Sequence, residues 1–157
     1  MNMTEKKKLV YISGSLKHVP REHWNIYEKI GKVVEESGME AYVPHLNTSR
    51  EVGFTDEQIL TGLAEEVVDK VFETDKNVVE NSDLIIAEVS NPSFGSGIEL
   101  GFALKANKKI ICLTNDKISI SPLIRGAAKK GLINLIEYSN EEEVLNRLRE
   151  TLREMNV

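Results

Sequence analysis

Cysteine is almost absent from this sequence of 157 residues, since Cys112 is the only one, and it lies inside an apolar stretch. A lone cysteine excludes an intrachain disulfide framework. No apolar run approaches the length of a membrane span, and residues 1–8 lack the apolar centre of a signal peptide. The three histidines, His18, His23 and His45, do not have the spacing of a metal site. These absences predict a cytoplasmic protein without a membrane segment or a resident metal.

Positive charge is also in short supply. The sequence has 20 Lys and Arg residues against 25 Asp and Glu residues, which gives a net charge of -5. This acidic balance disfavours a nucleic-acid backbone as the main partner. A hydrophobic content of 41% and a length of 157 residues suit a globular fold with a sizeable core. We expect a single domain over residues 1–157, in which the polar, Lys-rich residues 1–8 form a flexible start.

Five short apolar runs alternate with segments of helical periodicity, which is typical of a three-layer α/β domain with a parallel sheet. The runs predict strands over residues 9–12, 41–43, 84–89, 109–114 and within 132–138. Helices are expected over residues 20–37, from 56 to about 80 with a possible break near Gly62, from 98 onward, over 122–130 and after Asn140. Residues 45–54 are expected to form a loop. A five-stranded flavodoxin-like or Rossmann-like sheet of order 2-1-3-4-5 is the natural arrangement.

Two loops rich in small residues follow the first and third predicted strands. Residues 13–15, Ser-Gly-Ser, follow the first strand, and residues 90–97 follow the third. In the order 2-1-3-4-5, the carboxyl ends of strands 1 and 3 flank the switch point at which ligands bind. Free backbone N–H groups and a helix N-terminus at that point suit an anion. Neither loop matches a GxGxxG fingerprint or a Walker A loop, so a dinucleotide or a nucleoside triphosphate is not indicated.

Two carboxylates fall on helix faces that should pack inward. Glu99 is expected in the first turn of a helix, on the same face as Phe102, and Asp75 shares a face with Val71 and Val78. The alternatives are a glutamate that serves only the helix dipole and an aspartate on an exposed face. An unpaired buried carboxylate is costly and needs a partner or a role. Two inward carboxylates beside an anion-binding loop indicate glycosidic chemistry, in which one attacks the anomeric carbon and another group handles the proton.

The same motifs resemble the nucleoside 2-deoxyribosyltransferase superfamily, and within it the branch of 2′-deoxynucleoside 5′-phosphate N-hydrolases. The matching segments follow the family's order over most of the chain, and they are Tyr11–Ser15, Ile26–Ile30, His45, Asp75, Ala87–Gly101 and Ser121–Ala128. The Pro-Ser-x-Gly-x-Gly-x-Glu-Leu-Gly segment is fairly specific. The Ser-x-x-Ile-Arg-Gly-Ala-Ala segment points to the nucleotide hydrolases rather than to the nucleoside transferases.

The resemblance implies roles for both carboxylates. Glu99 is implied as the nucleophile, which forms a covalent deoxyribosyl intermediate that water then hydrolyses. Asp75 is implied to orient Glu99 or to handle the proton for the departing base. The implied products are a free base and 2-deoxyribose 5-phosphate, and no metal or organic cofactor is implied.

The resemblance also implies a binding site for a small nucleotide. The implied residues are Ile12, Ser13, Gly14, Ser15, Leu16, Lys17, His18, Tyr27, His45, Ser93, Gly95, Gly97, Ser121, Pro122 and Leu123. Ser15 and Ser93, with the backbone around Gly14 and Gly95, are implied to hold the 5′-phosphate. Tyr27 and His45 are implied to line the sugar and base pocket, with a core aromatic and a loop histidine as the plainer interpretations. In the family, the residue at Ser121 comes from the neighbouring subunit of a homodimer.

Two positions depart from the family pattern. Lys17 and His18 stand where the family more often has Arg followed by Gly, so the phosphate would meet a point charge instead of a bidentate fork. Ser96 stands between two glycines, where a small apolar residue is usual. Two other hypotheses stay open, a nucleoside deoxyribosyltransferase that passes the sugar to another base and a nucleotide-binding sensor without catalysis. The pairing of Asp75 with Glu99 disfavours the sensor, because a phosphate binder gains nothing from two carboxylates nearby.

Overall fold

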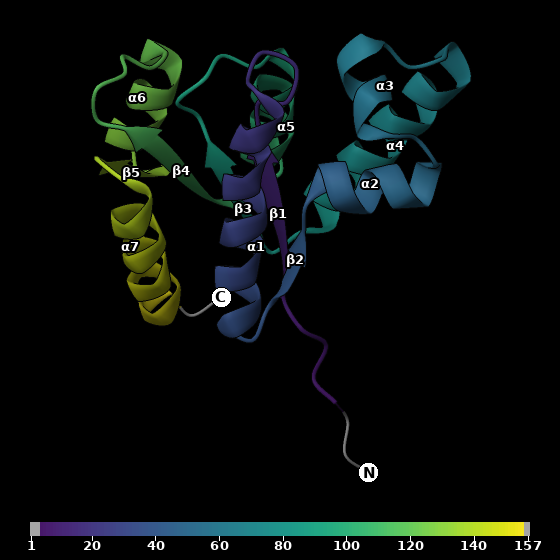
Figure 1. Cartoon of the computed structure of the whole chain (residues 1–157). Helices are drawn as coiled ribbons and strands as arrows, with labels where there is room; N and C mark the ends of the chain where they lie inside the picture. The colour runs from purple at the N-terminus through teal and green to yellow at the C-terminus, as the bar shows by residue number, and fades with distance from the viewer. Residues whose placement is uncertain (1–3, 156–157) are drawn as a thin grey trace.

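The computed structural model describes residues 4–155 and contains a five-stranded parallel sheet of order β2-β1-β3-β4-β5 (Figure 1). The strands are β1 Leu9–Gly14, β2 Glu40–Tyr42, β3 Leu84–Glu88, β4 Lys109–Asn115 and β5 Asn134–Tyr138. The helices are η1 Arg21–Trp24, α1 Asn25–Glu36, α2 Pro44–Val52, α3 Asp56–Thr61, α4 Glu65–Asn81, α5 Phe94–Lys105, α6 Pro122–Lys129 and α7 Glu141–Glu154. The predicted fold class and strand order are therefore confirmed.

The sheet is covered on both faces, because its strands carry apolar side chains on both sides. Val10 and Ile12 of β1 point into the core formed with α1 and α7. Tyr11 of the same strand points the other way, together with Ile85 and Ala87 of β3, toward the layer that contains α4 and α5. This alternation within β1 and β3 sends neighbouring residues at the carboxyl edge to opposite sides of the sheet.

Several helix boundaries follow the predicted signals. Thr55 and Gln58 form a capping box at the start of α3, with Gln58 N donating to Thr55 Oγ1 at 3.2 Å and Thr55 N donating to Gln58 Oε1 at 2.9 Å. The predicted break at Gly62 separates α3 from α4, where the glycine has a φ of 133°. Residues 4–8 precede β1 without helix or strand, and residues 1–3 of the expected flexible start lie outside the described residues. Within residues 4–155, no helix combines the length and the apolar composition needed to cross a lipid bilayer.

The prediction of a loop over residues 45–54 was wrong, because α2 occupies most of that segment. Pro44 begins the helix, a position where its missing N–H costs nothing, and Gly53 ends it in the left-handed conformation. Asn47 Oδ1 accepts a hydrogen bond from Val43 N at 2.8 Å across the first turn. The helix buries His45 and Thr48 on one side, so tertiary packing rather than sequence periodicity reveals it.

Helix α5 begins four residues earlier than predicted, at Phe94 instead of Ile98. Ser93 is the capping residue, and its Oγ accepts a hydrogen bond from Ser96 N at 3.1 Å. Gly95 and Gly97, which turn chemistry placed in a loop, lie in the first helical turn. Glu99 consequently lies in the second turn, where the helix dipole does little to stabilise a negative charge.

Candidate active site

The carboxyl end of β1 is packed tightly against α1. The hydroxyl of Tyr27 donates a hydrogen bond to the carbonyl oxygen of Ser15 at 2.7 Å, and Tyr27 is 2% exposed. A Cβ atom on Gly14 would lie 2.2 Å from Tyr27 Cε1, so only glycine allows this close approach. Ser13 and Ser15 are both buried. The loop after β1 is thus held in one conformation by an aromatic side chain of the first helix.

The loop after β3 lies directly beside the loop after β1, as the strand order predicts. Ser15 Oγ donates a hydrogen bond to the carbonyl oxygen of Pro92 at 3.2 Å, which links the two loops. Next to Pro92, Ser93 begins α5 and leaves the N–H groups of its first turn at the same edge of the sheet. The two loops therefore place a helix N-terminus and small polar residues together, an arrangement that can accept an anion.

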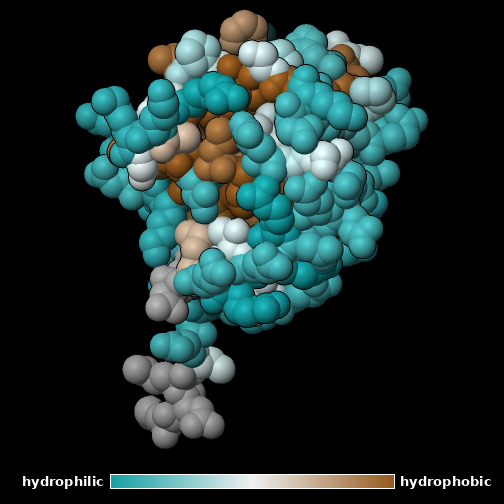
Figure 2. All heavy atoms as spheres, turned by 90° about the vertical axis from the view of Figure 1, so that its left-hand side faces the viewer, coloured by the Kyte–Doolittle hydropathy of each residue, from teal (hydrophilic) through white to brown (hydrophobic). Residues whose placement is uncertain are grey.

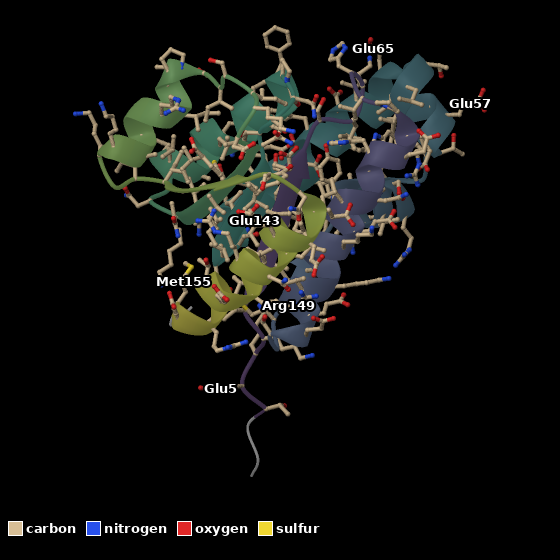
Figure 3. The ribbon with its side chains drawn as sticks, turned by 60° about the vertical axis from the view of Figure 1, so that its left-hand side comes forward. Glu5, Glu57, Glu65, Glu143, Arg149 and Met155 are labelled. Atoms are coloured by element: carbon tan, nitrogen blue, oxygen red, sulfur yellow. The ribbon has the colours of Figure 1, made fainter. Side chains whose placement is uncertain are left out.

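Asp75 lies on the side of α4 that packs toward the sheet and is held by a row of hydroxyl groups. Thr48 Oγ1 of α2 donates to Asp75 Oδ1 at 2.5 Å, and Tyr42 Oη lies 2.9 Å from Thr48 Oγ1. Burial raises the pKa of Asp75 to about 6, although the hydrogen bond from Thr48 lowers it in part. The acidic side chains Glu57 and Glu65 in the same region point outward instead (Figure 3).

Glu99 faces the same space from α5, and within residues 4–155 its buried Oε2 atom has no hydrogen-bond partner. Burial raises the pKa of Glu99 to about 8, and the negative charge of Asp75 contributes to the increase. The hydroxyls of Ser13 and Tyr11 lie close enough to lower the pKa of Glu99 in part. Among the described residues, Ser13 Oγ and Tyr11 Oη, like Glu99 Oε2, are buried without a hydrogen bond of good geometry, and the three groups lie close to one another.

Tyr11 joins the two carboxylates. Burial, followed by the charges of Glu99 and Asp75, raises the pKa of its hydroxyl well above 10, so Tyr11 stays protonated and can donate to either carboxylate. Its ring stacks on Tyr42 with centroids 5.7 Å apart. Because the carboxylate pKa values lie near 6 and 8, the pair shares one proton and one negative charge near neutral pH.

Tyr11 and Thr48 are functional candidates that sequence reasoning missed. The family resemblance implies no role for Tyr11, although the residue lies in the Tyr11–Ser15 segment. Its signal was available, because Tyr11 lies two residues before Ser13 in a buried strand and so shares its side of the sheet. A buried tyrosine hydroxyl also usually needs a polar neighbour. Thr48 had no such signal, since its segment was expected to be a loop.

Other predicted binding residues lie around this centre, and their roles stay predictions. The side chain of Ile12 is buried in the core, which leaves its backbone to face a ligand. Leu16 packs partly buried, and its carbonyl oxygen accepts a hydrogen bond from the indole of Trp24. Lys17 and His18 are exposed in a turn. His45 is 2% exposed, with Nε2 at 2.9 Å from an oxygen of the Glu28 carboxylate.

A cleft on the other side of α5 contains the remaining predicted residues. It has a volume of about 490 Å³ and is lined by Ser93, Gly97, Ser121 and Leu123 together with mainly apolar side chains of α5, α6 and the segment between β4 and α6. Ser121 caps α6, accepting a hydrogen bond from Leu123 N at 3.2 Å, and Pro122 begins the helix. Figure 2, which faces the side of α6, shows apolar side chains gathered in a hollow with hydrophilic ones around it.

Helix α5 separates this cleft from the carboxylates. Ser96, Gly97 and Leu100 line the cleft, whereas helical spacing turns Glu99 to the side that packs against α4. The structure therefore brings Asp75, Glu99 and the two loops together but leaves Ser121 of the same chain across α5. Within residues 4–155, no group of three or more His, Cys, Asp and Glu side chains is arranged to hold a metal ion.

Comparison with known proteins identifies the family of the chain. Residues 10–155 match the nucleoside 2-deoxyribosyltransferase family. The chain belongs to this family. The resemblance predicted from the motifs is thus confirmed.

Two of the proteins to which the chain is similar are named as nucleotide N-hydrolases. The 5-hydroxymethyl-dUMP N-hydrolase of Esox lucius is 32% identical over 142 residues, which cover 85% of this chain and 88% of that protein. The human protein of the same name is 31% identical over 136 residues, covering 85% and 73%. The structure of a Clostridium botulinum CMP N-glycosidase matches with a TM-score of 0.63 and 25% identity, over 90% of this chain and 98% of that one. The chain is therefore an enzyme of the group that hydrolyses N-glycosidic bonds in nucleotides.

Proposed function

We propose that the protein hydrolyses the N-glycosidic bond of 2′-deoxynucleoside 5′-monophosphates, releasing a free base and 2-deoxyribose 5-phosphate. The observation that carries the proposal is the placement of two partly buried carboxylates, Asp75 and Glu99, beside the Tyr11 hydroxyl and an anion-accepting helix N-terminus. Relatives named 5-hydroxymethyl-dUMP N-hydrolase support a deoxynucleotide substrate.

In the proposed reaction, ionised Glu99 attacks C1′ of the sugar while the bond from C1′ to the base nitrogen breaks. When Glu99 is ionised, the proton that the two carboxylates share is on Asp75. Asp75 gives this proton to the departing base as the bond breaks. A water molecule next attacks C1′ of the glycosyl ester, passes a proton to the Asp75 carboxylate and releases Glu99. The hydroxyl of Tyr11 lies close to both carboxylates, so it can steady whichever of them carries the charge.

The 5′-phosphate is proposed to lie between the loops after β1 and β3. Ser93 would donate to it from its hydroxyl, and Ser15 would do so by giving up its hydrogen bond to the Pro92 carbonyl. The N–H groups at the start of α5 would complete the cradle. Gly95 has no Cβ that would obstruct the phosphate where the backbone comes close. The phosphate thereby aligns C1′ with Glu99 one turn further along α5.

The substrate class can be measured as base release by chromatography. The substrates are the four deoxynucleoside 5′-monophosphates and 5-hydroxymethyl-dUMP, with their unphosphorylated forms and the matching ribonucleotides, each with and without an added acceptor base. We expect release from deoxynucleoside monophosphates that does not depend on the acceptor, and at least about 100-fold lower kcat/KM without the phosphate, because several charge-assisted hydrogen bonds are lost.

Other results would change the assignment. Base exchange on unphosphorylated deoxynucleosides with little hydrolysis would make the protein a deoxyribosyltransferase. Tight nucleotide binding without release of any base over a long incubation would make it a sensor. Equal rates on ribonucleotides and deoxyribonucleotides would contradict the proposed sugar preference.

We further propose that two copies of the chain form a homodimer in which Ser121 of one subunit reaches the phosphate of the other. Support comes from the position of Ser121 across α5 from Glu99, and from the apolar surface around it. Leu123 is 84% exposed and Phe94 is 93% exposed, both beside the cleft. Exposed apolar side chains next to an apolar cleft suit an interface between subunits.

A charge at this surface tests the dimer. Leu123→Glu is expected to shift the sedimentation coefficient from that of a dimer to that of a monomer, because a carboxylate cannot be buried in an apolar interface without a partner. The value of kcat/KM for the monophosphates should fall at least about tenfold, because Ser121 of one subunit no longer reaches the phosphate bound to the other. Leu60→Glu, at an exposed leucine of α3, is the matched control and should behave as wild type. A wild-type protein that sediments as a monomer while fully active contradicts the arrangement.

A further inference from the structure

Another buried carboxylate lies at the carboxyl end of β3, on the opposite face of the sheet from Glu99. Glu88 is 2% exposed, and its Oε1 accepts hydrogen bonds from the backbone N and the hydroxyl of Ser90 and from Tyr138 Oη, the first at 3.1 Å and the last at 3.2 Å. Its Oε2 is buried and has no hydrogen-bond partner in the described part of the chain. A buried carboxylate with a free oxygen is costly, and nothing in the proposed reaction uses it.

The free oxygen of Glu88 faces a histidine. His23 Nε2 of η1 lies 3.6 Å from Glu88 Oε2, and the same nitrogen lies 3.3 Å from Asn91 Nδ2. A neutral imidazole can accept from the amide of Asn91, whereas a protonated one can donate toward Glu88. The side chain of His23 is 32% exposed, so the ring is also open to a ligand from outside.

Asn91 and His23 are both connected to the proposed phosphate cradle. Asn91 directly precedes Pro92, whose carbonyl oxygen accepts from Ser15 Oγ, and it lines the same cleft as Ser93. The His23 ring packs edge-on against Tyr27 with centroids 5.8 Å apart, and Tyr27 holds the Ser15 carbonyl. His23 therefore contacts the loop after β3 through Asn91, and it is linked to the loop after β1 through Tyr27.

The side of Glu88 that does not face His23 ties the second loop to the sheet. Ser90, which donates to Glu88, also accepts a hydrogen bond through its Oγ from Asn115 N at 2.7 Å. Glu88 thus holds the start of the loop through Ser90, and its second oxygen faces His23, whose Nε2 also lies next to Asn91 in the middle of the loop. One buried carboxylate links the loop geometry to the position of a histidine.

We propose that His23, held in place by Glu88, supplies a positive charge to the 5′-phosphate of the substrate. The inference rests on the proposed function for the identity of the ligand. A ring that carries both protons can donate from Nε2 toward Glu88 and has its second N–H for the phosphate. His23 would serve in place of the arginine that the loop at Lys17 and His18 does not contain. The other charged or titratable groups around the ring are Glu88 of β3, Tyr27 of α1, Tyr138 of β5, and Arg21 and Glu22 of η1.

Binding of a phosphorylated sugar without turnover provides the test. The dissociation constants of 2-deoxyribose 5-phosphate and inorganic phosphate are measured by calorimetry at pH 6.5 for wild type, His23→Gln, His23→Arg and Glu88→Gln. We expect about tenfold weaker binding in His23→Gln, because one charge-assisted hydrogen bond is lost, and binding within about twofold of wild type in His23→Arg. Lys32→Gln removes a positive charge from an exposed position on α1 and is the matched control, with unchanged binding expected.

Two further measurements distinguish a direct charge interaction between His23 and the phosphate from a purely structural role of His23. Base release from deoxynucleotides by His23→Gln should show a raised KM with kcat within about threefold of wild type, because the interaction is made equally in ground and transition states. Glu88→Gln should weaken binding as much as His23→Gln does, and the double variant should show no further loss. If Glu88→Gln does not fold, the comparison of His23→Gln with His23→Arg decides by itself.

The inference is overturned if His23→Gln binds both probes as wild type does, or if His23→Arg binds as weakly as His23→Gln. These results are independent of the proposed hydrolysis. A wild-type protein that releases base while its His23 variants bind phosphate normally would retain the proposed function and lose this inference. A protein that binds the probes through His23 but releases no base from any nucleotide would retain the inference and lose the function.

Discussion

Replacing Glu99 with glutamine is expected to lower the rate of base release from deoxynucleotides at least about 1,000-fold while the protein stays folded. Glutamine keeps the size of the side chain but cannot form the glycosyl ester through an ionised oxygen. Its amide can still occupy the site between Ser13 and Tyr11, so the surrounding packing should survive. The measurement is single-turnover base release, followed by circular dichroism to establish the fold.

The same substitution should increase stability at alkaline pH. The pKa of Glu99 is about 8 in the folded protein and near 4.5 in the unfolded chain, so the folded state binds more protons between these values. Unfolding free energy attributable to this group therefore falls as the pH rises from about 4.5 through about 8. Glu99→Gln avoids that loss, and we expect it to exceed wild type at pH 8 by on the order of 1–3 kcal/mol, with a smaller difference at pH 5.

Denaturant unfolding at the two pH values provides the stability measurement. Glu73→Gln is the control, since it removes a carboxylate from an exposed position on the neighbouring α4. That variant should keep wild-type activity and show no pH-dependent change in stability. Full base release by Glu99→Gln would exclude Glu99 as the nucleophile. A stability difference that does not grow with pH would exclude a raised pKa for Glu99.

Replacing Asp75 with asparagine is expected to reduce kcat about 100-fold to 1,000-fold, which is the usual contribution of a positioned proton donor. Asparagine can still accept the hydrogen bond from Thr48, so the row of hydroxyls from Tyr42 should persist. The proton for the departing base is lost. A substrate whose base leaves easily, such as 5-fluoro-dUMP, should therefore lose less activity than dUMP does.

The pH dependence distinguishes a proton donor from a structural aspartate. In wild type, kcat/KM should fall below about pH 6, where both carboxylates are protonated, and above about pH 8, where the pair has lost its last proton. Asp75→Asn should keep the acid limb, which reports the ionisation of Glu99, and lose the alkaline limb. In Asp75→Asn the acid limb reports the pKa of Glu99 alone. This pKa should lie below 8, because the negative charge of Asp75 no longer raises it.

Asp69→Asn is the control for Asp75, because Asp69 is exposed on the same helix. It should leave both limbs and kcat unchanged. An Asp75→Asn variant with an unaltered bell-shaped profile would show that the proton comes from elsewhere. The uniform loss of activity on dUMP and 5-fluoro-dUMP would indicate that Asp75 orients Glu99 instead of donating a proton.

Local signals in the sequence were strongest for the sheet. Residues 84–89 and 109–114 are apolar because a parallel strand is buried on both faces, and their alternation with helices leads to the order 2-1-3-4-5. The positions of Asp75 and Glu99 on inward faces also followed from helical spacing. Helix α2 was missed, because its stability comes from packing His45 and Thr48 and not from its own periodicity.

The contacts that each polar side chain makes were harder to predict from the sequence than the strands and helices. Ser93, and not a residue near Ile98, begins α5, because its hydroxyl is free to accept from Ser96 N. The sequence indicates nothing about His23 beyond its lack of metal-site spacing, and its proximity to Glu88 depends on a contact between residues 65 positions apart. Contacts of this kind follow from the path of the whole chain, which no local pattern specifies.

The sequence by itself determined the alternation of strands and helices, the convergence of the two small-residue loops and the family to which the chain belongs. Each of these depends on local burial patterns or on motifs a few residues long. Only the tertiary structure decided that Tyr11 and Thr48 serve the carboxylates, that α5 separates Ser121 from Glu99, and that Glu88 faces His23. The reason is physical, since the pKa of a carboxylate and the role of a hydroxyl depend on groups brought together through space by packing.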